Sequence, residues 1–311
     1  MLRLRQCYPA EQLSIYYALL TAAYMVALPG GVAEGQRLPL LLARAAVLAA
    51  LFALQRADTR RAPRLTFARQ VLPLALVLFW YPETYYLNRF FFPNLDALFM
   101  QADELLLGGQ ACIAFSRHMP WAWLNELMNF AYLSFYFIIA LTVLASYKAA
   151  KAKGYRAAFV VLLSFLVYCL LFIILPVMGP QFYLPPPHNS TPDTWPFRAI
   201  MQLLQGWGER PTGAFPSSHV GITVICMQLL HAQKMRKLFW ALLPLAALLA
   251  LSTVYIKAHY VVDVLGGLLT APFLHRLGDG LWGKMSSSCY AERAPQRRNS
   301  ATNDGAGLSR H

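Results

Sequence analysis

Long apolar stretches separated by short polar connections make up most of the chain before about residue 276. A helix needs ~17–25 residues to cross the hydrocarbon core of a bilayer. Eight stretches are long enough to span it or nearly so: 13–30, 38–55, 70–88, 121–146, 157–179, 217–233, 238–256 and 259–275. The pattern therefore predicts an all-α fold, a polytopic membrane helical bundle of about eight transmembrane helices.

Two of the connections between these stretches are long. In the first, about 89–120, apolar residues recur at helical spacing, which predicts a helix lying in the plane of the membrane interface. The second, about 180–216, opens on GPQFYLPPP, whose prolines exclude a regular helix. It continues through WPFRAIMQLLQGWG, which predicts a short helix.

The chain contains no internal repeat, so we expect a single membrane-embedded catalytic domain at 1–285. Residues 286–311 are rich in Ser, Arg, Asn, Gly and Ala, which is typical of a disordered basic tail. The first apolar stretch lacks a small-x-small cleavage site, so we do not expect it to be a removable signal peptide.

Composition agrees with a membrane protein, because 58% of the residues are hydrophobic and 13% are charged, against about 25% charged in soluble domains. On a soluble protein the net charge of +13 would suggest nucleic acid as a partner. Here most basic residues fall in alternate connections, as the positive-inside rule requires if both termini are cytoplasmic. We therefore expect no nucleic-acid partner. The basic residues expected outside are Arg37, Arg89, Arg117, Arg198, Arg210 and Lys257.

The five cysteines do not indicate a disulfide framework, because only Cys112 is expected on the outside. Cys169 and Cys226 lie within predicted spans. The sequence contains no CxxC or HxxxH spacing, so we expect neither a bound metal nor another cofactor.

Candidate chemistry appears in two stretches that the charge pattern places on the same, outer side. GAFPSSHV, at 213–220, contains His219 where a span begins, and STVYIKAHYVVDVLGG, at 252–267, contains His259 and Asp263. A separation of four residues puts His259 and Asp263 on one face of a helix. A carboxylate bonded to one imidazole nitrogen fixes the tautomer and makes the other nitrogen a better nucleophile or base. These parts suit acyl or phosphoryl transfer.

The neighbouring residues favour phosphoryl transfer. Ser217 and Ser218 fall at the start of a predicted helix, where free backbone amides attract an anion. Lys257, Arg198 and Arg210 lie in the two connections that carry the histidines. Acyl transfer would also require an activated serine, and neither serine lies in a G-x-S-x-G turn.

GAFPSSH followed by HYVVD resembles two motifs of the type-2 phosphatidic acid phosphatase superfamily, P-S-x-H and H-x3-D, over about 157–276. The longer agreement looks most like the branch of inositol phosphorylceramide synthases and their bacterial relatives. The resemblance implies that His259 attacks phosphorus to form a phosphohistidine, oriented by Asp263. It implies that His219 protonates the leaving alkoxide, and that Ser217 and the amides of Ser218 and His219 bind phosphate oxygens.

The sequence departs from the superfamily pattern at the phosphate-binding cations. The arginine usual six residues before the second histidine is Thr253, and Lys257, Arg210 or Arg198 would supply the charge instead. Lysine cannot give the bidentate contact of arginine. The usual glycine of P-S-G-H is Ser218, and no K-x6-R-P motif is present, since Gln181 in the corresponding region is uncharged.

Bundle contacts are the alternative interpretation for several other polar or small residues. Glu83, Asp103 and Glu126 bind either head-group hydroxyls or other helices, and an ionisable group in a span requires a partner or a task. For Gly266 and Gly267, close contact between helices is a better interpretation than contact with a ligand. His231 and His275 are expected on the cytoplasmic side, away from the chemistry.

We therefore expect a membrane lipid phosphatase or phosphotransferase that acts on the non-cytoplasmic leaflet, in a bacterial inner (plasma) membrane. Its partners would be a phospholipid or prenyl-phosphate substrate and a lipid alcohol acceptor. Transfer of a phosphoinositol-like head group and simple hydrolysis of a lipid phosphate or prenyl diphosphate both fit the same residues. The alternative of another class is a transporter or membrane scaffold with decayed motifs.

Overall fold

The computed structural model describes residues 7–56 and 63–293, and the described residues contain helices but no β-strand. The all-α prediction is therefore confirmed. Short 3₁₀ turns lie at Pro29–Gly31 and Leu72–Leu76. The α-helices are α1 (Pro9–Ala27), α2 (Arg37–Arg56), α3 (Pro63–Val71), α4 (Val77–Leu87), α5 (Asp96–Leu107), α6 (Ala111–His118), α7 (Ala122–Ala149), α8 (Lys151–Ile174), α9 (Pro180–Tyr183), α10 (Phe197–Gly208), α11 (Ser218–Ala232), α12 (Arg236–Tyr255) and α13 (Val261–Arg293).

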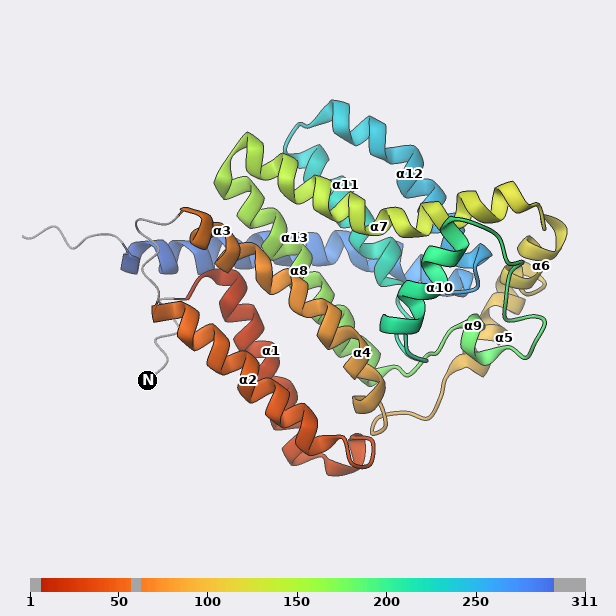
Figure 1. The fold of residues 1–311 in the computed structure, drawn as a ribbon, viewed down its shortest axis with the longest axis horizontal. Helices are drawn as coiled ribbons and strands as arrows, with labels where there is room; N and C mark the ends of the chain where they lie inside the picture. Colours follow the sequence, from red (N-terminus) through yellow and green to blue (C-terminus); the bar gives the residue numbers. More distant parts are fainter. Residues whose placement is uncertain (1–6, 57–62, 294–311) are drawn as a thin grey trace, which may run out of the picture.

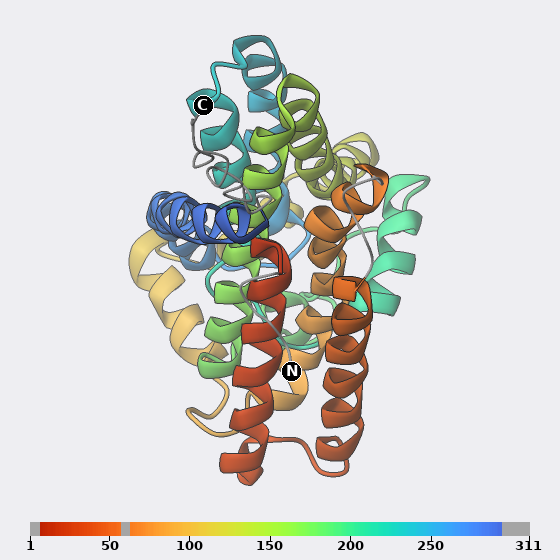
Figure 2. The same ribbon diagram turned by 90° about the vertical axis from the view of Figure 1, so that its left-hand side faces the viewer.

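Helix α8 runs through the centre of the bundle (Figures 1 and 2). It contacts α1, α4, α7, α11 and α13, and its apolar side chains form much of the main core. Phe159, Val160, Val161 and Leu162 are buried on consecutive positions of α8, so this helix is surrounded by protein on all sides. Helix α11 packs against α7, α8, α12 and α13, which places the start of α11 inside the bundle.

Five helical segments among the described residues are long and apolar enough to cross a membrane: Arg37–Arg56, Arg64–Leu87, Ala122–Ala149, Lys151–Ile174 and Arg236–Tyr255. The expected count of eight is not reached. Helix α11 is apolar but has only 15 residues. The two other expected spans coincide with α1 and α13, where Glu11, Gln12 and Asp263 interrupt the apolar pattern.

Two buried ion pairs join the N-terminal helices. Arg44 of α2 donates to both carboxylate oxygens of Glu83 on α4, at 3.1 and 2.7 Å. Arg69 of α3 donates to both oxygens of Glu11 on α1, at 2.6 and 2.8 Å. Charged groups within an apolar bundle need such partners. The helix-contact interpretation of Glu83 is therefore the one that the structure supports.

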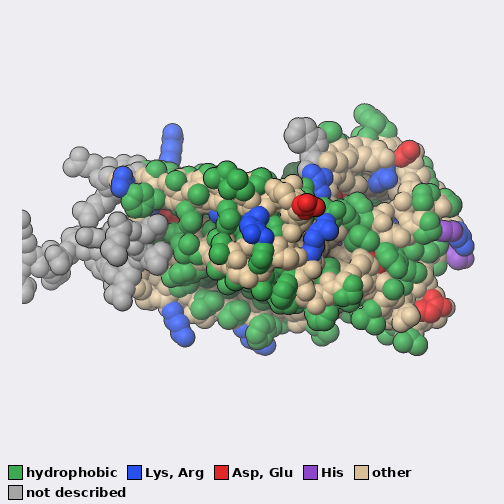
Figure 3. Space-filling model, turned by 90° about the horizontal axis from the view of Figure 1, so that it is seen from below, with side chains coloured by type: hydrophobic (Ala, Val, Ile, Leu, Met, Phe, Trp, Pro, Cys, Tyr) green, Lys and Arg blue, Asp and Glu red, His purple; other side chains and the backbone are tan. Residues whose placement is uncertain are grey.

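The predicted helix in the first long connection forms as α5, and its two faces differ sharply. Leu98, Leu105 and Leu106 are exposed, whereas Asp96 and Asp103 are completely buried. The acidic face of α5 therefore packs on the protein and the leucines face outward. Apolar side chains are also widely exposed on the face of the molecule drawn in Figure 3, as expected of a surface that contacts lipid.

The second long connection contains the expected short helix as α10, and one helical turn, α9, at Pro180–Tyr183. Helix α13 continues to Arg293, so 286–293, the start of the expected disordered tail, is helical. The rest of that tail, 294–311, lies outside the described residues. Helices α5, α6, α9 and α10 gather at one end of the bundle (right in Figure 1), beside the starts of α11 and α13.

Candidate active site

The two histidines of the sequence motifs lie side by side in the structure. His219 is the second residue of α11, and His259 lies in the short connection between α12 and α13. Their ring centroids are 5.9 Å apart, with an angle of 60° between the ring planes. A phosphorus atom bonded to a nitrogen of one ring would therefore be within reach of a proton carried by the other.

Two glycines allow α13 to approach the start of α11 this closely. A Cβ on Gly267 would lie 2.5 Å from the carbonyl oxygen of Ser217, and a Cβ on Gly266 would lie 2.6 Å from the Phe215 ring. The amide of Ser217 also donates to the carbonyl of Asp263 at 2.9 Å. The expectation that Gly266 and Gly267 serve helix contact is confirmed.

His259 presents Nδ1 to the carboxylate of Asp263. Nδ1 lies 3.5 Å from Oδ2 without a hydrogen bond between them, and the same oxygen accepts the amide of Tyr260 at 2.8 Å. Both side chains are buried. Burial lowers the pKa of His259 to about 4, against opposing effects of the Ala214 backbone and the charge of Glu209. At neutral pH the imidazole is therefore uncharged and retains the lone pair that a nucleophile requires.

His219 is enclosed by aromatic side chains of α7. The Tyr132 and Phe135 rings each lie 4.4 Å from the His219 ring, and the Tyr132 hydroxyl is 3.5 Å from His219 Nδ1. The imidazole also lines a cavity of about 100 Å³ together with Gln205 and Glu209. The ring is therefore held in place on one side and borders an open space on the other.

The start of α11 offers backbone amides to an anion. Ser217 is the N-cap, and its hydroxyl accepts the amide of Val220 at 3.4 Å. Within the described part of the chain, the amides of Ser218 and His219 make no backbone hydrogen bond. The helix N-terminus favours negative charge at this point. The hydroxyl of Ser217, which we expect to bind phosphate, also caps the helix and keeps its own hydrogen to donate.

A family model described as the PAP2 superfamily matches residues 99–277 of the chain. The matched segment is more than half of the 311 residues and contains His219, His259 and Asp263. The chain belongs to the PAP2 superfamily. It is thus a membrane enzyme of the phosphatase type, from a family whose substrates are generally phosphorylated lipids. The predicted superfamily and enzyme class are confirmed.

The PAP2 match supports the superfamily as a whole and makes no assignment to the branch of inositol phosphorylceramide synthases. No curated protein matches the chain, and no solved structure matches it. The two histidines and the aspartate of the PAP2 motifs are all present, although the usual cationic residues are not. The retained His–Asp–His set argues against the transporter or scaffold alternative.

The cations expected to bind phosphate in this PAP2 protein occupy different environments. Lys257 is buried, and its ammonium donates to the Ser116 hydroxyl at 2.7 Å and to the Ser190 carbonyl at 2.8 Å. Burial lowers the pKa of Lys257 to about 8. Lys257 therefore ties α6 to the loop before α10, an arrangement that the charge pattern did not indicate.

The other two expected phosphate-binding cations, Arg198 and Arg210, lie near Glu209. The guanidinium of Arg210 donates to the Glu209 carbonyl at 3.3 Å. Arg198, on α10, has a buried Nε with no hydrogen-bond partner among the described residues. Its pKa is lowered by burial, and the charges of Asp193 and Glu209 oppose that effect. A buried, unpaired donor is a candidate for an anion ligand.

Two aspartates of α5 support the site, and sequence reasoning assigned neither to it. Asp103 accepts the amides of Val261 and Val262, both at 2.9 Å, and thereby caps α13 two residues after His259. Asp96 accepts the amides of Met178 and Gly179 at 2.7 and 2.9 Å and the Tyr260 hydroxyl at 3.0 Å. The available signal was a pair of aspartates seven positions apart, which lie on one face of a helix.

Glu126 on α7 caps another helix, α10, as Asp103 caps α13. Its carboxylate accepts the amides of Phe197 and Arg198, at 2.6 and 3.3 Å, and the Thr194 hydroxyl. These contacts cap α10 and fix the loop before it. Asp103 and Glu126 therefore both bind other helices, which is the structural alternative that we considered for them.

Gln181 lies where the superfamily pattern would place a cationic motif, and in the structure it binds a carboxylate. Its side-chain amide donates to Glu209 Oε2 at 2.8 Å, and Gln205 donates to Gln181 at 3.4 Å. Glu209 also accepts the Tyr132 hydroxyl at 3.3 Å. An acidic side chain beside His219 was not expected from the sequence.

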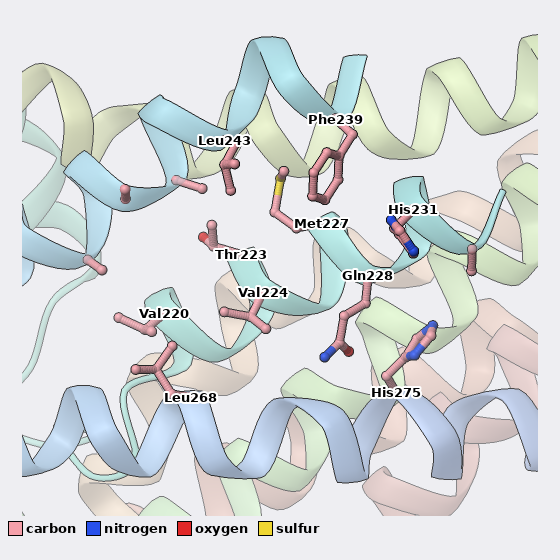
Figure 4. Close-up of a pocket in the computed structure, with 14 residues that line it drawn as sticks. Val220, Thr223, Val224, Met227, Gln228, His231, Phe239, Leu243, Leu268 and His275 are labelled. Atoms are coloured by element: carbon pink, nitrogen blue, oxygen red, sulfur yellow. The ribbon is translucent and has the colours of Figure 1, made fainter. Parts of the chain in front are cut away.

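An apolar groove lies away from His219 and His259. Its volume is about 550 Å³, and Figure 4 shows it along α11 from Val220 to His231, between α12 and α13. Phe239 on α12 and His275 on α13 face it. The lining is almost entirely apolar and contains no acidic or cationic side chain besides the histidines. The groove therefore offers no phosphate-binding chemistry, and the candidate active site of this PAP2 enzyme remains at the start of α11.

Proposed function

We propose that this protein transfers the phosphoryl or phosphoalcohol group of a lipid phosphate through a covalent phosphohistidine on His259. The observation that carries the proposal is the 5.9 Å approach of the His219 and His259 rings beside the free amides at the start of α11. One imidazole bears a carboxylate partner and the other borders a cavity. Nucleophile, proton donor and anion site are thus adjacent.

The first step breaks the bond between phosphorus and the leaving oxygen. The His259 nitrogen that does not face Asp263 forms a bond to phosphorus, and the phosphorus–oxygen electron pair moves onto the leaving oxygen. His219 in its charged form supplies a proton to that oxygen, so an alcohol departs. Asp263 stabilises the charge that develops on the His259 ring.

The second step reverses these roles. Water or an alcohol gives a proton to His219 and attacks phosphorus, and the bond to His259 breaks, so both imidazoles return to their starting forms. Charge on the transferring group is met by the amides of Ser218 and His219 and by Arg198 or Arg210. Of these two cations, the buried and unpaired Nε of Arg198 favours Arg198.

Hydrolysis and transfer differ only in what reaches the phosphohistidine. Transfer of a phosphoinositol-like head group to a lipid alcohol rests on the length of the motif agreement, from GAFPSSH to the two glycines after HYVVD. The polar wall of the His219 cavity, with Gln205 and Glu209, supports it because these groups suit a hydroxyl-bearing acceptor. Simple hydrolysis of a lipid phosphate or prenyl diphosphate requires only water at the same place.

The proposed location of the reaction is the non-cytoplasmic leaflet. In support, the α7–α8 and α11–α12 turns, which contain Lys151 and Lys234, lie toward the end of the bundle opposite α5, α6, α9 and α10 (Figure 1). Basic connections face the cytoplasm. The site at the start of α11 then opens to the other side.

The experiment uses purified protein in detergent with phosphatidic acid, a prenyl diphosphate or phosphatidylinositol, each with and without ceramide or diacylglycerol. Free phosphate without acceptor indicates hydrolysis, and acceptor-dependent movement of the head group indicates transfer. Wild type and the His118→Ala control should both acquire an acid-labile ³²P label. His259→Ala should not be labelled, and its rate should fall by at least ~10³-fold. Wild-type turnover by His259→Ala would rule out the covalent step.

A further inference from the structure

We propose that Tyr132 and Glu209 are positioning residues that hold His219 in the protonation state and orientation required for proton donation. The proposal rests on the proposed function, because it assigns a supporting pair to the proton donor of that reaction. Each histidine would then have its own acidic partner: Asp263 directly for His259, and Glu209 through a tyrosine hydroxyl for His219.

The three groups form a continuous chain of polar contacts. The Tyr132 hydroxyl lies 3.3 Å from Glu209 Oε1 and 3.5 Å from His219 Nδ1. The Tyr132 ring also stacks on the imidazole, with centroids 4.4 Å apart and planes 27° apart. Tyr132 therefore restrains both the tilt of the His219 ring and the direction of Nδ1.

The donor-to-acceptor direction of these hydrogen bonds depends on which group receives the single hydroxyl hydrogen of Tyr132. If the hydroxyl donates to the Glu209 carboxylate, its oxygen is free to accept a hydrogen bond from Nδ1–H of His219. Nδ1 then keeps its hydrogen, and the other ring nitrogen gains and loses the proton. That nitrogen is the one available to the leaving oxygen in the first step and to water or alcohol in the second.

The surroundings of Glu209 favour this direction. Gln181 donates to the second carboxylate oxygen at 2.8 Å, which orients the carboxylate with neutral donors. No side-chain ion pair to Glu209 occurs among the described residues, although Arg198 lies within electrostatic range. Glu209 Oε1 is therefore free to accept a hydrogen bond from Tyr132.

The three residues of this hydrogen-bonded chain come from distant parts of the sequence. Tyr132 lies on α7, Glu209 directly follows α10, and His219 is the second residue of α11. The same carboxylate and imidazole line the cavity of about 100 Å³ with Tyr136, which is one helical turn beyond Tyr132. Tyr136 makes no hydrogen bond to either group in the described structure, so it provides a matched control.

The experiment compares two substrates in single-turnover measurements of alcohol release. An alkyl phosphate has a poor leaving group that needs a proton, whereas p-nitrophenyl phosphate has a leaving group that departs without one. Tyr132→Phe and Glu209→Gln should slow release from the alkyl phosphate by about 10- to 100-fold and release of p-nitrophenol by less than about threefold. His219→Ala should show the same selectivity with a larger effect, and Tyr136→Phe should show none.

A second comparison separates positioning from general structural support. Adding Tyr132→Phe to His219→Ala should cause no further loss, because the tyrosine acts only through the imidazole. Equal slowing of both substrates, or an additional tenfold loss in the double variant, would overturn the proposal. An active His259→Ala variant would overturn only the covalent step, since the leaving-group comparison measures proton donation separately.

Discussion

Gly267 of α13 lies directly against the carbonyl oxygen of Ser217 at the start of α11. No side chain fits between them, because a Cβ at Gly267 would also approach the amide of Gly221 to 3.2 Å. The distance between His219 and His259 therefore depends on this close contact between α13 and the start of α11.

Gly267→Ala should separate the two helices and lower both stability and activity. Relieving an overlap with backbone atoms typically costs ~1–3 kcal/mol, and the shift would also move His259 relative to His219. Thermal unfolding and turnover of the purified variant measure the two effects. The matched control is Gly280→Ala on the same helix, where an added Cβ meets nothing within 4 Å. Equal behaviour of the two variants would contradict the role of this contact.

Asp263→Asn should preserve the fold and reduce the rate of phosphoenzyme formation. The amide retains an oxygen for the Tyr260 backbone but carries no charge to stabilise the His259 ring, and a comparable loss in another His–Asp pair is ~10⁴-fold. Asp279→Asn is the control, because His275 and Asp279 have the same four-residue spacing at 3.6 Å elsewhere on α13. Rapid phosphate labelling of Asp263→Asn would refute the assigned role.

Asp103→Ala should destabilise the start of α13. Its carboxylate caps the amides of Val261 and Val262, and loss of a helix cap costs ~0.5–2 kcal/mol. Because His259 lies just before these residues, turnover should also fall. The neighbouring Glu104 is exposed, so Glu104→Ala should leave the melting temperature and the rate nearly unchanged. A normal melting temperature for Asp103→Ala would argue against the cap.

Arg198 and Lys257 should respond differently to neutralisation. Arg198→Gln removes a buried, unpaired donor and should weaken inhibition by inorganic phosphate about tenfold, the effect of one charge-assisted hydrogen bond. Lys257→Met breaks the bonds to Ser116 and Ser190 and should mainly lower the melting temperature. Phosphate inhibition that weakens in Lys257→Met but not in Arg198→Gln would restore the sequence-based expectation for Lys257.

The sequence predicted the parts of the site that depend on local spacing and on the charge of the connections. His259 and Asp263 lie close together as their four-residue spacing indicated, although His259 precedes α13 instead of lying on it. His219 lies near them because the start of α11 and the residues before α13 are at one end of the bundle. Helix α5 was predicted because its apolar residues recur at helical spacing, and α10 was predicted as a short helix in the stretch WPFRAIMQLLQGWG.

The sequence did not predict contacts made between distant helices. Tyr132 looked like one more aromatic residue in a span, and its role depends on the position of Glu209, 77 residues later. Lys257 was assigned to phosphate from its charge and its place in the connection that carries His259. Its positive φ of 67° and its burial belong to a turn that directs the side chain to α6. Fewer than the expected eight spans stand out among the described residues, because α1 and α13 include polar residues such as Glu11 and Asp263 within their apolar runs.

Helix α5 has a consequence for where the catalytic unit begins along the chain. Asp96 and Asp103 hold both the segment after α8 and the start of α13, so an excised piece beginning at residue 157 would lose its own scaffold and the hydroxyl of Tyr132. The smallest fragment that keeps these contacts must therefore begin before Asp96, slightly ahead of residue 99, where the family match starts.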